Sequence, residues 1–409
     1  MLEEQKLSSN GVRPAKRVFA YCHDSVGIGH LARTLAVCRK IGAVHPATTF
    51  LLVTGTPYVP LMVSDENVDF LKLPALKKVN NSTYEARNLS FSPDQVIACR
   101  ESLLLSTVQH FQPDLLLVDK APVGVCGELK SSLRWMRRNR PDARMVFGMR
   151  DIEDEAEVTR AAWDKAGIPE VLDDCFDEIW VYGMREVFDV TSEYRLPAAI
   201  SDKLSYVGYV APEPCGHGRS SDQDSDHVLV TVGGGTDGDF LLRQFLSEAA
   251  GRVLRRGLKV TVVGGPDLPK STRGSLKRQS QVMPEVEWID FEKCMDCRVR
   301  SARLIVSMGG YNTLTLIARN RKPVLVVPRT TPRIEQSIRA QLWSNFGAAA
   351  VEDSNTLTPT RLADRVLELI EHGPRETHPR LDLRGLDRVG QRVQAWWQEE
   401  NAHAPALHL

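Results

Sequence analysis

The sequence repeats one local pattern that restricts the fold strongly: a short apolar strand, a turn containing glycine, and then a helix. The apolar runs at 18–22, 228–232 and 304–307 each lead into such a turn, and apolar residues spaced for one face of a helix follow. Strands that pass directly into helices build parallel sheets whose two faces are covered by those helices. We therefore expect an α/β protein.

Other apolar runs extend this pattern over most of the chain. The expected strands lie at 18–22, 49–53, 70–73, 115–118, 145–149 and 178–182 in the first half, and at 228–232, 260–263, 286–289, 304–307 and 324–327 in the second. Between the halves, residues 211–226 are rich in proline, glycine, serine and aspartate, as a linker would be. The prediction is two Rossmann-like, doubly wound parallel-sheet domains that face a cleft.

The domain boundaries follow from this linker. We expect a flexible leader at 1–16, an N-terminal domain at 17–210, the linker at 211–226, a C-terminal domain at 227–375 and a tail at 376–409. In the tail, Val389, Val393, Trp396 and Trp397 form the apolar side of a helix. Such a helix either packs back across the domain junction or caps the second domain.

Composition excludes several kinds of partner. Lysine plus arginine equal aspartate plus glutamate at 52 each, so nothing predicts nucleic acid or an anionic membrane as a bulk partner. No run approaches the roughly 18 apolar residues of a membrane span, and the polar start of the chain lacks the apolar core of an export signal. We expect a cytoplasmic protein; peripheral membrane association stays open, and the sequence does not specify an oligomeric state.

The residues that most resemble metal ligands are predicted not to bind a metal. Of the eight cysteines, only Cys294 and Cys297 have C-x-x-C spacing, and a zinc site would need a second pair. Asp222, Asp224 and Asp226 alternate as in a calcium loop, but that loop's glycine and glutamate are missing. We expect free thiols in a reducing compartment and no metal site.

The glycine turns predict an anion site. Gly309 and Gly310 allow a ligand to approach the backbone closely, and the helix that follows presents unpaired N–H groups, with Asn312 or Thr313 available to cap them. Because the carboxyl ends of the strands in two facing domains lie opposite each other, all three glycine junctions should meet between the domains. The expected ligand carries phosphate.

Four motifs in this chain resemble those of nucleotide-sugar glycosyltransferases with the GT-B fold, in the group related to the muropeptide-lipid N-acetylglucosaminyltransferases. These motifs are GIGHLAR at 27–33, VTVGGGTDG at 230–238, SMGGYNTLTLIA at 307–318 and PRTTPRIEQ at 328–336. The resemblance runs from about residue 17 to about residue 371, as a rough limit given boundary errors of a few residues. It implies an acceptor site in the N-terminal domain and a donor site in the C-terminal domain.

The resemblance also implies which residues form the site. The donor-binding set is Gly234, Gly235, Thr236, Phe291, Met308, Gly309, Gly310, Asn312, Thr313, Arg333, Glu335 and Gln336. The acceptor-binding set is Gly27, Gly29, His30, Arg33, Asp119, Lys120 and Asp151. Relatives often carry a ribose-binding glutamate where this chain has Leu316, and leucine cannot accept a hydrogen bond. The nucleotide base therefore stays open, with a UDP-sugar favoured.

His30 is the expected catalytic base, since an imidazole titrates near neutrality and His30 stands at the start of a helix. Asp24 could orient His30 or act as the base, and Asp119 and Asp151 also end predicted strands. The expected reaction is an inverting, metal-independent transfer, without a cofactor, to a hydroxyl or amine of a small-molecule or lipid-linked acceptor.

Two other functions fit the same ligand. The glycine-histidine-arginine pattern at 27–33 is also similar to that of nucleotide-sugar hydrolases of the pseudaminic acid pathway, although the long segment at 72–112 favours a shaped acceptor pocket. An epimerase is less favoured, because its paired acidic and histidine signatures are absent from the sequence. A non-catalytic nucleotide-sugar-binding homologue is the third hypothesis, and Leu316 is its best support.

Overall fold

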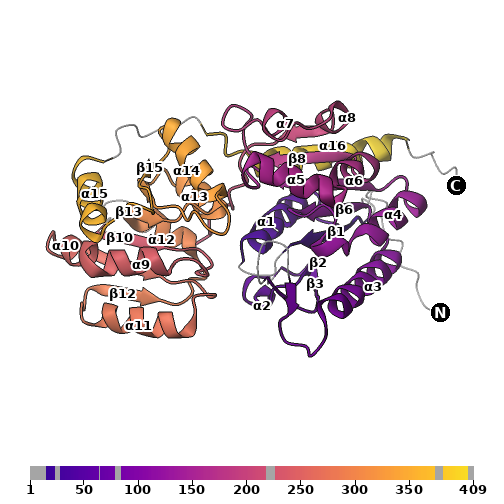
Figure 1. Ribbon diagram of the computed structural model, residues 1–409. Coiled ribbons are helices and arrows are strands. Elements are labelled where there is room, and N and C mark those ends of the chain that lie inside the picture. Colours follow the sequence, from indigo (N-terminus) through magenta and orange to yellow (C-terminus); the bar gives the residue numbers. More distant parts are fainter. Residues whose placement is uncertain are drawn as a thin grey trace, which may run out of the picture.

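The computed structural model describes residues 15–23, 28–63, 65–78, 84–217, 226–373 and 381–403. Two α/β units lie side by side, each built on a parallel sheet (Figure 1). The first sheet takes its strands from residues 17–206 and the second from residues 227–351. The expected fold class, two Rossmann-like parallel-sheet domains, is confirmed.

The N-terminal unit has a parallel sheet with the strand order β3-β2-β1-β6-β7-β8-β9. Its strands are β1 (Arg17–Cys22), β2 (Thr49–Thr54), β3 (Val68–Lys72), β6 (Leu115–Asp119), β7 (Arg144–Arg150), β8 (Glu178–Tyr182) and β9 (Leu204–Tyr206), beside an antiparallel hairpin of β4 (Leu76–Lys78) and β5 (Tyr84–Ala86). Its helices are α1 (Gly29–Val44), α2 (Val59–Met62), α3 (Pro93–Phe111), η1 (Val125–Gly127), α4 (Lys130–Asn139), α5 (Ala156–Ala166), α6 (Ile168–Cys175), α7 (Val190–Glu193) and α8 (Ala198–Ser201).

The C-terminal unit has a parallel sheet with the strand order β12-β11-β10-β13-β14-β15. Its strands are β10 (His227–Thr231), β11 (Lys259–Val263), β12 (Val286–Ile289), β13 (Ala302–Ser307), β14 (Val324–Val326) and β15 (Ala350–Val351). The helices are α9 (Asp239–Gln244), the π-helical η2 (Phe245–Ala249), α10 (Ala250–Leu254), α11 (Lys270–Gln281), α12 (Met295–Ser301), α13 (Tyr311–Arg319), α14 (Glu335–Asn345) and α15 (Pro359–His372). The last helix, α16 (Gly385–His403), follows this unit in the sequence.

Each sheet reverses its strand order at one point, next to its first strand. In the first sheet β1 lies between β2 and β6, and in the second β10 lies between β11 and β13. Open α/β sheets bind ligands at such a reversal, outside the carboxyl ends of the strands. Three of the four strands at these points, β1, β10 and β13, are those that lead into the glycine turns of the sequence. The topology therefore brings the turns after β10 and β13 to ligand-binding positions, whereas residues 24–27 after β1 lie outside the described residues.

The observed strands agree with the expected ones to within two residues, because strands buried on both faces read as continuous apolar runs. Every residue of β6 is buried, for example. The pattern missed β4, β5, β9 and β15, which are only two or three residues long. Short strands that are partly exposed carry too few apolar residues to show a period.

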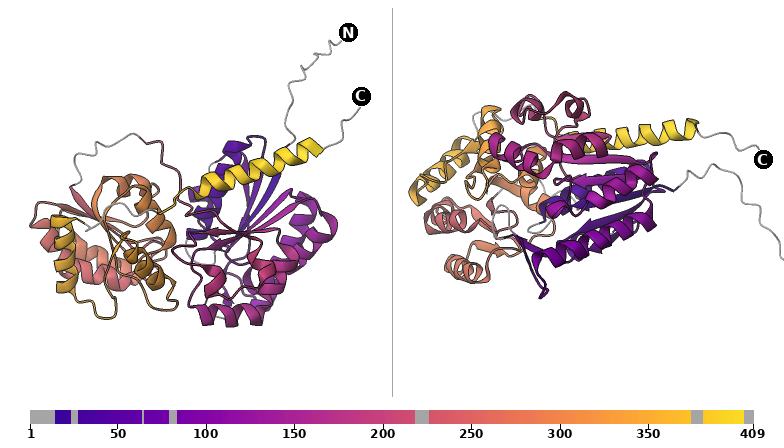
Figure 2. Two further views of the ribbon diagram at one scale, coloured as in Figure 1. Left: turned by 90° about the horizontal axis from the view of Figure 1, so that it is seen from above. Right: turned by 45° about the vertical axis from the view of Figure 1, so that its right-hand side comes forward.

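Helix α16 lies along the first unit, although it follows the second unit in the sequence (Figure 2). Trp396 stacks on Trp180 with ring centroids 5.8 Å apart, and Trp397 meets His45 edge to face at 4.9 Å. An antiparallel bridge between Val210 and Arg384 joins the two crossing segments just before the helix begins. Of the two arrangements left open by the sequence, packing back onto the first unit is the one observed.

A buried ion pair joins the two units directly. Arg339 of α14 donates from Nε and Nη2 to the two carboxylate oxygens of Asp151, both at 2.7 Å, and Asp151 follows β7. The two side chains are 1% and 3% exposed. Arg339 also donates from Nη1 to the carbonyl of Gly309 at 3.3 Å. The paired charges of Arg339 and Asp151 are thus buried at the junction between the units, together with the carbonyl of Gly309.

We expect Arg339→Met to lower the free energy of unfolding by about 3–5 kcal/mol, because the change leaves the Asp151 carboxylate buried without its partner. Chemical denaturation followed by tryptophan fluorescence measures the loss. The matched control is Arg39→Met, which removes a similarly two-pronged but exposed pair with Asp65 and should cost about 1 kcal/mol or less. Equal losses from both variants would contradict the importance of burial at the junction.

Candidate active site at the domain junction

His30, Arg33 and Asp119 form a compact group at the reversal point of the first sheet. His30 and Arg33 lie on the first turn of α1, and Asp119 ends β6. Asp119 contacts His30 Nδ1 at 2.7 Å and accepts two bonds from Arg33, from Nε at 2.9 Å and from Nη2 at 2.7 Å. The Arg33 and Asp119 side chains are 2% and 1% exposed, whereas His30 is 18% exposed. Of the three, His30 alone reaches solvent appreciably.

This arrangement fixes the protonation state of His30. Burial lowers the pKa of His30 to about 4, although Asp119 opposes that change. Burial would raise the pKa of Asp119, but Arg33 and His30 outweigh it and hold that pKa at about 2. At neutral pH, Asp119 is therefore an ionised acceptor for an Nδ1–H of the imidazole, although Arg33 Nη2, which can only donate, also lies 2.8 Å from Nδ1. In the tautomer that donates from Nδ1 to Asp119, the Nε2 lone pair of His30 can accept a proton.

Two predicted site residues, Asp24 and Gly27, lie outside the described residues. Gly29 begins α1, and its carbonyl accepts a bond of 2.6 Å from Asn312 Nδ2 of α13. This bond crosses between the two units. It holds the start of α1, with His30, next to the start of α13.

The start of α13 has no side-chain cap. Gly309 has φ +82°, and a side chain there would meet Val326 at 2.9 Å, so this position requires glycine for packing. Gly310 is the N-terminal cap residue, and the nearest atom to a side chain placed there would be Thr313 Oγ1, at 4.0 Å. No side chain caps the helix. The expected capping by Asn312 or Thr313 is therefore wrong: the Asn312 amide bonds to Gly29 instead, and the first N–H groups of α13 keep their capacity for an anion.

The second glycine turn, after β10, packs on a neighbouring loop. A side chain at Gly235, where φ is +95°, would meet the carbonyl of Gly264 at 2.4 Å, so the backbones touch. Thr236 next to it is exposed. From the first unit, Tyr58 donates to Asp267 on this loop at 2.8 Å. Of the other predicted donor residues, Phe291 is half-buried after β12 and Met308 is buried after β13.

Tyr311 was not predicted from the sequence, yet it lies at the centre of the junction. The guanidinium carbons of Arg33 and Arg339 lie 5.2 Å and 5.8 Å from the centroid of its ring. Its hydroxyl accepts a bond of 2.9 Å from the backbone N–H of Val210. Such cation–π contacts favour a fixed position for both arginines. Tyr311 follows the two glycines directly, but no local pattern distinguishes an aromatic core residue from a ligand contact.

The predicted motif after β14 forms contacts within the protein. Glu335, 3% exposed, accepts a bond of 2.7 Å from Arg329, and Gln336 lies against the carbonyl of Met308 and against Arg329 Nε. Arg333 lies 3.9 Å from Asp154 of the first unit. The motif therefore braces the turn before α13, and Glu335 Oε2 remains buried without a partner among the described atoms.

Asp151 and Leu316 have different surroundings from those expected. Asp151 was expected to border the acceptor, but Arg339 occupies both of its oxygens, so it stabilises the junction. Leu316 is 7% exposed and belongs to the apolar core between α13 and its neighbours. A leucine here gains stability from burial in this core.

Lys120 is the centre of a second polar group. It adopts φ +72°, which is uncommon for a residue with a side chain, and its ammonium group pairs with Glu153. Burial lowers the pKa of His23, and the charge of Lys120 helps to lower it further. Burial alone would raise the pKa of Glu335, but that pKa is lowered overall, and the charge of Lys120 contributes to this. His23 Nδ1, Glu153 Oε1 and Glu335 Oε2 are all buried without a hydrogen-bond partner in the described part of the chain. Buried polar atoms of this kind are ready to bond a ligand.

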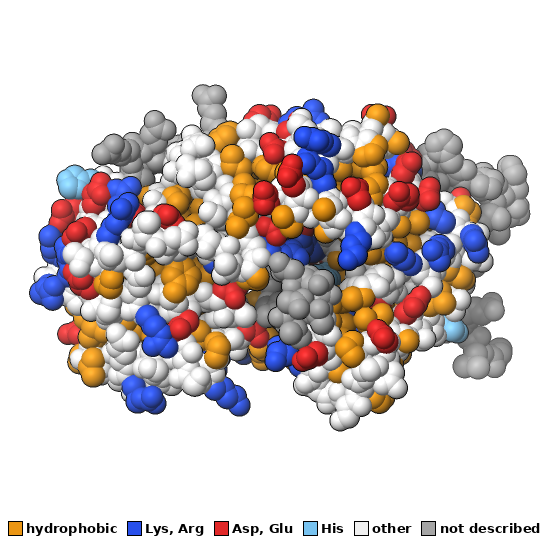
Figure 3. Space-filling model, viewed as in Figure 1, with side chains coloured by type: hydrophobic (Ala, Val, Ile, Leu, Met, Phe, Trp, Pro, Cys, Tyr) orange, Lys and Arg blue, Asp and Glu red, His pale blue; other side chains and the backbone are white. Residues whose placement is uncertain are grey.

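Arg150 also lies here and was not predicted. Its side chain donates to the carbonyls of Ile152 at 3.0 Å and Glu153 at 3.2 Å, and no described carboxylate lies within ion-pair distance. Burial lowers its pKa to about 10, which leaves it charged at neutral pH. Basic side chains are visible in the hollow between the two units in Figure 3. An anionic ligand would balance this buried charge.

Comparison with known proteins identifies the second unit. Residues 227–381 match the model described as the glycosyltransferase family 28 C-terminal domain. The match covers the C-terminal unit from β10 through α15. This unit contains the glycine turns after β10 and β13 and the motif at 328–336.

Curated relatives agree with this assignment. The UDP-N-acetylglucosamine–N-acetylmuramyl-(pentapeptide) pyrophosphoryl-undecaprenol N-acetylglucosamine transferase of Phenylobacterium zucineum is 30% identical over 176 residues, which are 42% of this chain and 45% of that protein. The enzyme of the same name from Gloeothece citriformis is 26% identical over 148 residues, 36% and 39% of the two chains. The matched part thus spans less than half the length of these relatives. The expected relationship to the muropeptide-lipid N-acetylglucosaminyltransferases is confirmed.

Solved structures extend the likeness to the whole fold. MurG of Acinetobacter baumannii superimposes with a TM-score of 0.56 at 12% identity, over 93% of this chain and all of that chain. A putative UDP-N-acetylglucosamine 2-epimerase from Listeria monocytogenes gives 0.63 at 11%, over 94% and 97% of the two chains. These neighbours confirm the GT-B arrangement, and because they include an epimerase, the fold alone does not fix the reaction.

We expect His30 to stay neutral down to about pH 4, whereas a histidine in the unfolded chain titrates near about 6.5. NMR titration of the imidazole carbon protons measures this, with His30→Gln used for assignment and urea-denatured protein as the reference. Because the pKa of His30 is lower in the folded chain, its contribution to stability is lost as pH falls from 6.5 towards 4. In Asp119→Asn the pKa should fall further, since Asp119 favours the charged form. A value near 6.5 would contradict the burial of His30.

Proposed function

We propose that this protein transfers a sugar from a nucleotide-diphosphate sugar to an acceptor hydroxyl or amine. One observation carries the proposal: the His30–Asp119 pair of the first unit and the uncapped start of α13 in the second are joined by the Asn312–Gly29 bond of 2.6 Å. A base and an anion site are thereby held side by side, each from a different domain. A transferase that binds acceptor and donor on opposite domains requires this arrangement.

The diphosphate of the donor binds at the start of α13 in this proposal. The N–H groups after Gly310 and the positive end of the helix dipole attract its oxygens. Arg150 supplies a buried positive charge whose described hydrogen-bond partners are backbone carbonyls, with Glu335 and Asp151 near enough to act on it electrostatically. As the bond between the anomeric carbon and the phosphate oxygen breaks, negative charge grows on the leaving group, and fixed donors stabilise it. No metal ion is needed at the diphosphate.

His30 acts as the general base. Its Nε2 accepts the proton of the acceptor while the acceptor oxygen or nitrogen attacks the anomeric carbon from the side opposite the diphosphate. The nucleoside diphosphate leaves, and the configuration at the anomeric carbon inverts. Asp119 stabilises the imidazolium that forms, and Arg33 keeps Asp119 ionised and in place. The unpartnered oxygens of Glu153 and Glu335 are candidates to bond sugar hydroxyls.

A lipid-linked acceptor is favoured over a small soluble one. Large apolar side chains stay exposed on the first unit around β3 and α3: Leu61, Phe70, Leu89, Phe91 and Leu103 are 37–51% exposed. Val282 of the second unit is exposed as well, but most of the exposed large apolar side chains belong to the first unit, which suits contact of that unit with a lipid. No helix in the described residues is both long and apolar enough to cross a bilayer, so the lipid would be met from one side.

We expect His30→Ala to lower turnover by about 10²–10⁴ and to leave donor affinity nearly unchanged, because the base acts on the acceptor. Release of UDP from UDP-N-acetylglucosamine with a muropeptide-lipid acceptor measures turnover, and calorimetry measures affinity. His372→Ala, an exposed histidine on α15, is the matched control. Unchanged turnover in His30→Ala would remove His30 from the mechanism. Free sugar released without an acceptor would instead identify a hydrolase, and donor binding with no turnover on any acceptor would identify a non-catalytic homologue.

Gly310→Leu should weaken donor binding at least about tenfold, because a side chain would enter the space where the phosphate contacts the start of the helix. Calorimetry with UDP-sugars in EDTA measures this and also tests binding without a metal. Gly274→Leu on α11 is the matched control, since Gly274 also has ordinary φ and open surroundings. Equal affinity in both variants would contradict the phosphate assignment.

A further inference from the structure

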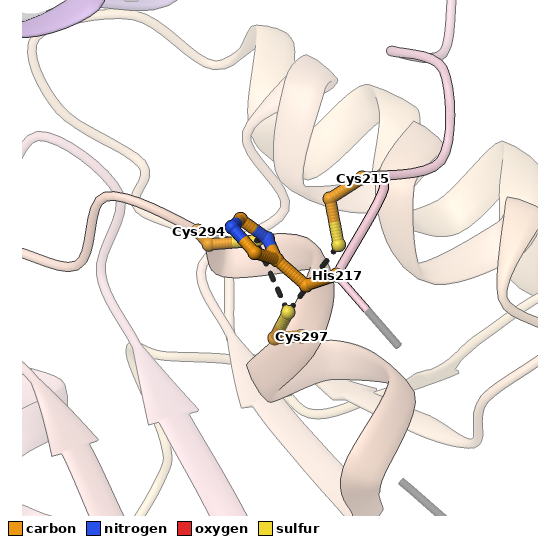
Figure 4. A group of neighbouring side chains, drawn as sticks. All are labelled: Cys215, His217, Cys294 and Cys297. Carbon is orange, nitrogen blue, oxygen red and sulfur yellow. Dashed lines mark hydrogen bonds between the residues drawn. The ribbon is translucent and has the colours of Figure 1, made fainter. Parts of the chain in front are cut away.

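Four potential metal ligands meet where the segment between the two units contacts α12 (Figure 4). They are Cys215 and His217 from that segment and Cys294 and Cys297 from the start of α12. Their ligand atoms all lie within 4.8 Å of one another. The expectation that no second pair joins Cys294 and Cys297 is wrong, because the partners are 77 or more residues earlier in the sequence and include a histidine.

The distances within this group, the Cys₃His cluster, suit a tetrahedral site. The sulfurs of Cys215 and Cys297 are 3.3 Å apart, those of Cys294 and Cys297 are 3.2 Å apart, and Cys294 Sγ lies 3.6 Å from His217 Nδ1. In a tetrahedral zinc site the Zn–S and Zn–N bonds of about 2.3 and 2.0–2.1 Å separate two ligand atoms by roughly 3.5–3.8 Å. Small outward shifts of the thiols would admit the ion.

The surroundings of the cluster favour charged thiolates. Arg300 Nη2 lies 3.6 Å from Cys215 Sγ and 3.7 Å from Cys297 Sγ, and it donates to the carbonyl of His217 at 3.3 Å. Three thiolates with Zn²⁺ and a neutral histidine carry one net negative charge, which Arg300 would balance. Contacts from outside the ligand shell commonly orient and tune the ligands in this way.

Asp296, between the two cysteines of α12, fixes the backbone of the same segment. It accepts bonds from the N–H of Cys215 at 3.0 Å and from Asn320 Nδ2 at 2.9 Å, and it pairs with Arg319. Arg319 also donates to the carbonyl of Pro212. The segment that carries Cys215 and His217 is therefore held on α12 and α13 independently of the thiols, which preforms the cluster.

We propose that Cys215, His217, Cys294 and Cys297 bind one structural Zn²⁺ that fastens the interdomain segment to the C-terminal unit. Four protein ligands close the coordination shell and leave no position for a substrate, as in structural zinc sites. A soft, thiolate-rich set selects zinc over magnesium or calcium. Rotation between the units would then be confined to the residues before Cys215, because the metal makes the segment after them part of the C-terminal unit.

Metal analysis of the full chain tests this site. Protein purified from zinc-supplemented cells should contain about one zinc ion per chain. Stripping with a chelator and a thiol-reactive mercurial, followed by thiol reduction and addition of Co²⁺ alone, should give the visible spectrum of a tetrahedral cobalt-thiolate complex. Cys297→Ser should lose both signals, whereas Cys99→Ser, a half-buried cysteine on α3 outside the cluster, should keep them. Removal of zinc should lower the midpoint of thermal unfolding, because zinc binds only the folded site.

His217→Ala keeps the test decisive if Cys297→Ser fails to fold, because His217 is exposed and its loss removes only one ligand. We expect that variant to fold and to bind zinc at least about tenfold more weakly. Three results would overturn the proposal: wild-type protein without stoichiometric zinc that also binds no Co²⁺, undiminished zinc in folded His217→Ala and Cys297→Ser, or a Cys294–Cys297 disulfide in freshly purified protein. None of these measurements depends on the proposed transferase activity.

Discussion

The pairing of Arg339 with Asp151 is the interaction on which the arrangement of this protein depends. It places two charges from different domains out of water, and such a pair is stable only when its geometry is close to ideal and its remaining hydrogen-bonding capacity is used. Both conditions are met, since Arg339 bonds both oxygens of Asp151 and also the carbonyl of Gly309. The glycine turn that begins α13 is thereby fixed relative to the first domain.

The candidate catalytic group of His30, Arg33 and Asp119 is connected to this pair through Tyr311. Tyr311 lies under the guanidinium groups of both Arg33 and Arg339, so the ion pair within the first domain and the pair between domains share one aromatic ring. A change in the angle between the domains would disturb both arginines. Arg33 and His30, which lower the pKa of Asp119, both belong to the first domain, and Tyr311 connects this group to the junction through its contact with Arg33.

Much of this could be predicted from the sequence, because local pattern and site geometry coincide at several points. Strands buried on both faces appear as uninterrupted apolar runs, and the glycine turns sit at the strand ends where α/β sheets bind ligands. His30 and Asp119 were both singled out as residues at element ends, and the fold does bring them together. Tyr311, Arg150 and Arg339 could not be recognised, because an aromatic or basic residue in a helix or at a strand end has no local feature that distinguishes an interdomain contact from an ordinary surface position.

The sequence by itself determined the fold class, the two parallel sheets and the glycine turns that relate the chain to nucleotide-sugar glycosyltransferases, since all of these depend on local periodicity and short motifs. Tertiary structure alone decided which charges pair. Asp119 pairs with His30, and Asp151 pairs with Arg339. Leu316 is buried in the core. Cys215 and His217 lie next to the pair of cysteines near residue 295. The reason is physical: partners far apart along the chain meet only through sheet topology and domain packing, which no local pattern encodes.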